Sequence, residues 1–275
     1  MGAHVRSLIE FACADETLIG TLDAAPGTTG LLIVSGGNEI RAGAHRGMAL
    51  LAARLAEAGH PVFRFDRRGI GDSSGDNRGF ESSADDIAAA AVTFRQTAPH
   101  LTRIVGFGNC DAAAALALFH HAAGLDALIL ANPWTVEDQD DEMPPAAAIR
   151  AHYAERLRDP GQWLRLLRGG VDIRKLINGL LKSSAKQSQA PDTLAARLAD
   201  ALGTAEVPVS LLLARRDNTA IAFLDAWCGA AFEKARTKAE VEQRDTASHS
   251  FASPDDKDWL FERVMAALTS RSPPD

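Results

Sequence analysis

A cysteine between small residues is the first candidate for chemistry. Cys110 stands in the segment GNCDA at 108–112, after a short apolar run and before an alanine-rich stretch at 112–121. A strand, a sharp turn and a helix in this order form a nucleophile elbow, here with Cys where Ser is usual. The start of the helix favours a thiolate. The pattern predicts that Cys110 is a nucleophile, and a buried cysteine that packs as a small apolar group is the alternative.

A thiol nucleophile needs a base, and the base needs an acid that orients it. Asp217 follows the next-to-last predicted strand, and His249 follows the last one. Catalytic groups of open α/β sheets lie beyond the carboxyl ends of the strands, and the order nucleophile, acid, base is that of elbow hydrolases. We therefore predict a triad of Cys110, His249 and Asp217. Asp245 is a rival acid, His249 is alternatively a plain loop histidine, and Asp217 is alternatively a helix cap.

Acyl transfer also needs N–H donors for the developing oxyanion. The backbone amide of Asp111, the residue after the nucleophile, is one candidate. The second donor is expected in the turn after the first core strand, from the amide of either Gly37 or Asn38. Glycines in that turn let the backbone approach a substrate closely, although an ordinary tight turn needs them too.

Three basic residues follow that turn and form a candidate substrate-binding group: Arg41, His45 and Arg46. They would bind an anionic group of a substrate. We favour a structural role for these three residues, because basic residues of this kind more often hold loops together through ion pairs. The partners here would be Asp66 or Asp72.

The elements that must position these residues alternate between strands and helices. Strands are expected at 5–13, 17–23, 31–34, 61–65, immediately before 108, 126–131, 207–214 and 239–243, and helices at 45–59, 82–97, 112–121, 220–231 and 255–268. The first two strands read as an antiparallel pair. The later alternation predicts an α/β fold with a mostly parallel, doubly wound sheet.

The alternation breaks in the second half of the chain. Helices are expected at 144–158, 161–168, 171–182 and 193–202, with a polar loop at 183–190 and no strand between 134 and 206. We therefore predict a core built from 1–133 and 206–275, with a helical lid inserted at 134–205.

Composition limits the classes of function. The 275 residues carry a net charge of −7 without a basic run, which argues against nucleic acid as a partner. No apolar segment is long enough to span a bilayer, and the first residues lack the layout of a secretory signal. Three widely spaced cysteines argue against a disulfide framework and a cysteine metal site. The expectation is a cytoplasmic protein without metal or organic cofactor, and the oligomeric state stays open.

With these residues in hand, the sequence resembles the α/β-hydrolases over essentially its whole length. Its segments at 36–46, 64–73 and 108–112 are similar to one subgroup, the first type of exosortase A system-associated hydrolase. That resemblance implies a nucleophile at Cys110, an acid at Asp217 and a base at His249. It also implies a place beside bacterial exopolysaccharide biosynthesis and protein-sorting genes. The chain departs from the broader pattern in two places, with Ser35 where a His is usual and with Cys at the elbow, as dienelactone hydrolases also have.

The function expected from these observations is hydrolysis of an ester or thioester of a small or lipid- or sugar-linked acyl substrate. Water would resolve a thioacyl-enzyme. Acyl transfer to a sugar or lipid acceptor would use the same residues. A binding protein on a hydrolase fold, with an unreactive Cys110 and no aligned His249, is the alternative of a different class.

Overall fold

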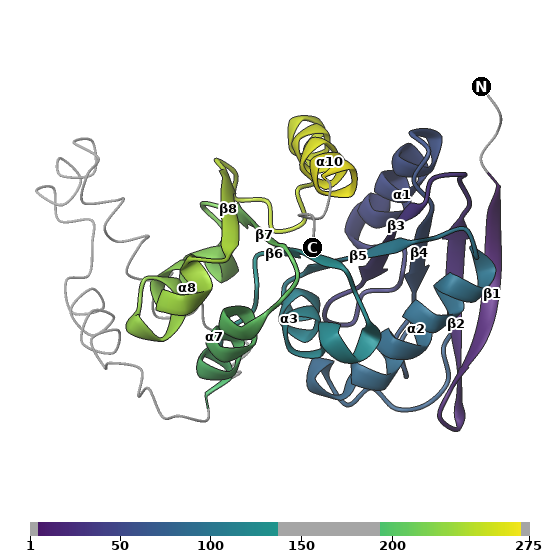
Figure 1. The fold of residues 1–275 in the computed structure, drawn as a ribbon, viewed down its shortest axis with the longest axis horizontal. Helices are drawn as coiled ribbons and strands as arrows, with labels where there is room; N and C mark the ends of the chain where they lie inside the picture. Colours follow the sequence, from purple (N-terminus) through teal and green to yellow (C-terminus); the bar gives the residue numbers. More distant parts are fainter. Residues whose placement is uncertain (1–4, 137–192, 271–275) are drawn as a thin grey trace, which may run out of the picture.

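A mostly parallel sheet forms the centre of the molecule in the computed structural model, which describes residues 5–136 and 193–270 (Figure 1). In this part of the chain the strands are β1 (Arg6–Cys13), β2 (Glu16–Asp23), β3 (Thr29–Val34), β4 (Val62–Phe65), β5 (Arg103–Asn109), β6 (Ala127–Ala131), β7 (Val209–Ala214) and β8 (Ala239–Arg244). The helices are α1 (Gly47–Glu57), α2 (Ala84–Thr97), α3 (Asp111–Ala123), α7 (Leu194–Thr204), α8 (Asn218–Trp227), α9 (Glu233–Arg236) and α10 (Pro254–Thr269). Short 3-10 turns are η1 (Ala44–Arg46), η2 (Phe80–Ser82) and η3 (Ala230–Phe232).

The strand order is β1-β2-β4-β3-β5-β6-β7-β8. β2 runs antiparallel to both β1 and β4, and the pairs from β4 through β8 are parallel. The predicted α/β fold with a mostly parallel, doubly wound sheet is confirmed. β5 therefore lies inside the sheet with the carboxyl ends of β3 and β6 beside its own.

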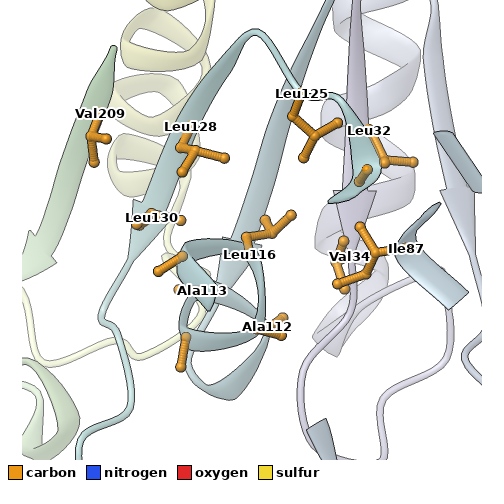
Figure 2. Packing of buried hydrophobic residues seen from close by; sticks show 14 of the residues in the cluster. Leu32, Val34, Ile87, Ala112, Ala113, Leu116, Leu125, Leu128, Leu130 and Val209 are labelled. Atoms are coloured by element: carbon orange, nitrogen blue, oxygen red, sulfur yellow. The ribbon is translucent and has the colours of Figure 1, made fainter. Parts of the chain in front are cut away.

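Helices cover both faces of the sheet, which explains the uninterrupted apolar run of β3. Leu31 and Ile33 pack in one buried cluster with residues of α1 and α10. Leu32 and Val34 pack in the other cluster, with residues of α2, α3 and α7. Figure 2 shows this second cluster around α3, where Leu116 lies among Leu125 and Leu128 and other side chains that line the sheet.

The elbow depends on a close approach of α3 to β5. A Cβ atom at Gly108 would lie 2.7 Å from the backbone carbonyl of Ala112, and one at Gly106 would lie 2.7 Å from Leu125 Cδ1. Both distances are too short for a real Cβ. At Gly108 the obstacle is the backbone of α3, so glycine is needed there, whereas at Gly106 the end of the Leu125 side chain can shift. The alanines of α3 complete the contact, because small side chains let a helix sit close to a sheet.

Two helix predictions need correction at their ends. The helix expected at 45–59 begins only at Gly47, because His45 and Arg46 have φ of 51° and 59° and cannot continue a right-handed helix. The helix expected at 220–231 is interrupted. α8 ends at Trp227, and the 3-10 turn Ala230–Phe232 follows it.

The predicted lid falls mainly outside the described residues, including the helices expected at 144–158, 161–168 and 171–182 and the loop at 183–190. The described part contains its last predicted helix, α7, which begins after Thr193 with the hydroxyl of that residue accepting the Ala196 amide at 3.2 Å. Leu194, Leu198 and Leu202 of α7 are buried in the cluster that contains α3. In the described ranges no helix is both long and apolar enough to cross a membrane.

Candidate active site

The elbow holds Cys110 in a strained backbone conformation. Its φ of 62° and ψ of −127° are unusual for a residue with a side chain. The Cys110 amide donates to Ala131 O at 3.0 Å, and the Cys110 carbonyl accepts from Ala113 and Trp134. The surroundings therefore fix this turn from both sides. Because the first helical hydrogen bond comes from Ala113, the preceding amide of Asp111 stands free of that ladder, as expected at a helix start.

The structure brings His249 and Asp217 together with Cys110 beyond the ends of β5, β7 and β8. His249 Nδ1 lies 2.9 Å from Asp217 Oδ2. A carboxylate only accepts, so Nδ1 carries the proton and donates it. Asp217 also caps α8, because its Oδ2 accepts the Ala220 amide at 3.2 Å. The two interpretations of Asp217, as a helix cap and as the acid that orients His249, therefore do not exclude each other, because the same carboxylate makes both contacts.

The electrostatics of His249 favour the imidazolium. Burial alone lowers the pKa of the ring. The hydrogen bonds to Asp217 and to Cys110, together with the negative charges of both partners, outweigh burial and raise the pKa of His249 to about 10. Near neutral pH the ring is therefore protonated and can donate to both Asp217 and Cys110.

The rival acid lies elsewhere. Asp245 Oδ1 is 3.2 Å from Arg216 Nε and 3.8 Å from Arg215 Nη2, in an exposed group of charges. Its nearness to His249 in sequence does not bring it to the imidazole, since Asp217 holds Nδ1.

The turn after β3 lies against the elbow. A Cβ atom at Gly36 would be 2.5 Å from Asp111 Oδ1 and 2.7 Å from Asn109 O. The Gly37 amide donates to Asp111 Oδ1 at 2.7 Å. Asn38 is exposed, and its side-chain oxygen accepts from Asn77 at 2.8 Å. The turn therefore lies beside the elbow, and the Gly37 amide is occupied by a carboxylate of the protein itself.

A buried arginine beneath this turn escaped sequence reasoning. Arg67 Nη2 donates to Gly37 O at 2.6 Å and lies 3.6 Å from Asp111 Oδ2. Its side chain is only 5 % exposed, and Nη1 is buried without a hydrogen-bond partner. Arg67 therefore holds the turn from below, and Asp111 is its counterion at the elbow. The signal in the sequence is its place immediately after Asp66, where β4 ends at the same edge as β3 and β5.

Two asparagines form a second group that sequence reasoning missed, which we call the amide clamp (Asn109 and Asn132). Asn132 Nδ2 donates to Asn109 Oδ1 at 3.0 Å and to His249 O at 3.1 Å, and Asn109 Nδ2 donates to His249 O at 3.2 Å. Asn132 Oδ1 accepts the Ala214 amide at 2.8 Å. Asn132 is fully buried with φ of 42°. The clamp thus ties the backbone of His249 to the ends of β5, β6 and β7.

The candidate substrate-binding residues take different positions. Arg41 pairs with Asp66 and lies 2.9 Å from Asp72 Oδ2. Its side chain thus holds loops together through ion pairs, which is the structural role that we favoured from the sequence. His45 and Arg46 are exposed in the turn before α1, and in the described residues neither hydrogen-bonds to the triad.

In the described part of the chain, no group of three or more His, Cys, Asp or Glu side chains could hold a metal ion. The three cysteines of the sequence, Cys13, Cys110 and Cys228, are all free, and they are buried, half-buried and exposed respectively.

Comparison with known structures gives the same fold. An esterase of Pyrococcus furiosus is 17% identical, with a TM-score of 0.65 over 96% of this chain and 91% of that one. An esterase of Exiguobacterium antarcticum is 16% identical, with a TM-score of 0.60 over 95% and 99%. The thioesterase domain of the curacin biosynthetic pathway is 13% identical, with a TM-score of 0.57 over 96% and 100%. At these identities the likeness concerns the fold alone.

A search of curated proteins finds no match to the sequence. The model of one family, described as serine aminopeptidase S33, matches residues 30–220, which is more than half of the chain. The match contains Cys110 and Asp217 and ends before His249. The protein belongs to this family of α/β-hydrolases.

Proposed function

We propose that the protein hydrolyses an ester or thioester through a triad of Cys110, His249 and Asp217. The observation that carries the proposal is the alignment of His249, whose Nδ1 lies 2.9 Å from Asp217 and whose ring hydrogen-bonds to Cys110. The esterases and the thioesterase among the structural neighbours lend support at the level of the fold.

The steps follow from the geometry. The Cys110 thiolate attacks the acyl carbon, and the carbonyl oxygen becomes an oxyanion beside the amide of Asp111 and that of Gly37 or Asn38. The imidazolium of His249 then gives its proton to the leaving oxygen or sulfur, and a thioacyl-enzyme remains. The neutral ring next takes a proton from water, which attacks the thioester and restores the thiolate. Asp217 keeps the proton on Nδ1, so that the other ring nitrogen faces the sulfur.

The resemblance to exosortase A system-associated hydrolases suggests where the substrate of the enzyme comes from. We propose an acyl substrate of the exopolysaccharide or protein-sorting systems of a bacterium, with the enzyme in the cytoplasm. The free state of all three cysteines is consistent with a reducing compartment.

The first experiment measures iodoacetamide alkylation of Cys110 against pH, in the wild type and in His249→Ala, with peptide mass spectrometry to locate the adduct. We expect fast alkylation near pH 7 that His249→Ala abolishes. Cys228 is an internal reference, because it is an exposed cysteine outside the candidate site.

The same variants then decide between catalysis and binding. On an ester that the wild type cleaves, Cys110→Ala should lose turnover. A Cys110 that reacts like Cys228 in both proteins, together with turnover that survives Cys110→Ala, would refute the proposal.

A further inference from the structure

Asp111 has a side chain that the proposed mechanism does not use. Its backbone amide is an oxyanion donor, but its carboxylate lies on the neighbouring donor, with Oδ1 2.7 Å from the Gly37 nitrogen. The side chain is 16 % exposed, so water screens its charge only in part. The residue after the nucleophile therefore places a negative charge on the Gly37 amide, the donor that the developing oxyanion would need.

We propose that Asp111 determines the charge preference of the site, competing with the oxyanion for the Gly37 amide and disfavouring acyl groups that carry a negative charge near the scissile carbonyl. The proposal rests on the proposed function of Cys110. It adds a specificity-determining residue and a substrate class, neutral acyl groups.

The competition follows from hydrogen-bond chemistry. The Gly37 amide has one proton, which a carboxylate and an oxyanion cannot both receive at full strength. A bond to a charged acceptor is also about twice as strong as one to a neutral acceptor. The carboxylate must therefore turn away before the Gly37 amide can stabilise the oxyanion.

Arg67 makes the effect of removing the carboxylate larger. Its guanidinium is 3.6 Å from Asp111 Oδ2 and almost fully buried. With Asp111 neutral, the positive charge of Arg67 beneath the turn is no longer compensated there. The site then changes from one that repels anions to one that attracts them.

The test compares two alkylating agents that react identically and differ in charge, neutral iodoacetamide and anionic iodoacetate. In both, the thiolate sulfur bonds to the CH₂ carbon and iodide leaves. The variant is Asp111→Asn, which keeps size and removes charge. The matched control is Asp126→Asn, which removes the same charge and alters an equivalent bond, since Asp126 accepts the Ile104 amide at 2.7 Å.

In the wild type, the ratio of the iodoacetamide rate to the iodoacetate rate should be higher at Cys110 than at Cys228. Asp111→Asn should lower the Cys110 ratio by about tenfold, as expected for a charge a few ångströms from the reaction in a partly screened site. It should leave Cys228 unchanged, and Asp126→Asn should leave both unchanged. A Cys110 ratio that Asp111→Asn leaves within twofold, or that Asp126→Asn lowers equally, overturns the proposal.

A second arm measures kcat/KM on p-nitrophenyl acetate and on the p-nitrophenyl monoester of succinic acid. Asp111→Asn should raise the value for the acetate about tenfold, which is below the roughly 10²–10³-fold that one whole oxyanion donor is worth, and raise the succinate value further. A fall in kcat/KM for both esters would refute the proposed competition for the Gly37 amide. Failure of the proposed function can be distinguished from failure of this inference, because the former would appear as alkylation of Cys110 that does not depend on His249.

Discussion

Replacing Asn132 by Asp tests whether the amide clamp positions His249, the proposed catalytic base. The change keeps the shape of the side chain and still lets one oxygen accept the Ala214 amide. The former Nδ2 position becomes an oxygen, which then faces Asn109 Oδ1 at 3.0 Å and His249 O at 3.1 Å. Two donor–acceptor contacts thus become contacts between acceptors.

The magnitude follows from these two contacts. A buried polar group left without its partner costs about 1–3 kcal/mol, so two cost about 2–6 kcal/mol. Rotating the Asn109 amide by 180° relieves one contact but turns its oxygen toward His249 O, so at least one repulsive contact remains. The loop that carries His249 should shift to escape it. Because a displacement near 1 Å costs about 10²-fold in rate, we expect kcat to fall by about that factor.

The assay is steady-state hydrolysis of p-nitrophenyl acetate between pH 5 and 9, beside the control Gln96→Glu, which adds the same charge at an exposed position of α2. The ratio of the variant rate to the wild-type rate should rise as pH falls, because a protonated carboxyl regains one donor for His249 O. A folded Asn132→Asp protein with wild-type kcat and a ratio independent of pH would refute the reasoning.

Three further predictions concern the triad and the elbow. Asp217→Asn should lower kcat by about 10³–10⁴-fold, as loss of the orienting carboxylate does in serine proteases, and should lower the pKa of His249 in an NMR titration. Because the pKa of His249 is raised to about 10, its contribution to stability is present in full below its ordinary value and is lost as pH rises through about 10. Urea unfolding should therefore show a larger loss of stability between pH 7 and 10 in the wild type than in His249→Ala. Gly108→Ala should destabilise the protein by about 1–3 kcal/mol in thermal unfolding, because its Cβ would meet the Ala112 backbone at 2.7 Å, whereas Gly203→Ala in α7 meets nothing closer than 3.4 Å and should not.

The fold was predictable because its signals are local. The apolar run of β3 and the alternation of strands with helices each depend on residues that are neighbours in sequence. The two corrected helix ends depend on backbone dihedral angles, which cannot be deduced from the residue types. His45 and Arg46 are ordinary helix residues in the sequence, yet both take positive φ.

The residues of the proposed triad could be chosen from sequence because strand ends in a parallel sheet share one edge, so order along the chain carries spatial information. Asn132 stands at such an end as well, but asparagine is so common in turns that its type predicts nothing about a partner. Its role appears only when His249 O, 117 positions away, is placed beside it. The contact of Asp111 with Gly37, 74 positions apart, is equally invisible, since the motif concerns the backbone of that residue.

The position of Arg67 explains why a carboxylate persists where it competes with the reaction. The turn after β3 must be held still if its amide is to serve as a donor, and Arg67 holds it through Gly37 O at 2.6 Å. A guanidinium that is 5 % exposed needs a counterion, because an uncompensated buried charge costs several kcal/mol. Asp111 supplies that charge from the first turn of α3, where a negative side chain also suits the helix dipole. The carboxylate that occupies the Gly37 amide is thus also the counterion of the arginine that holds the turn.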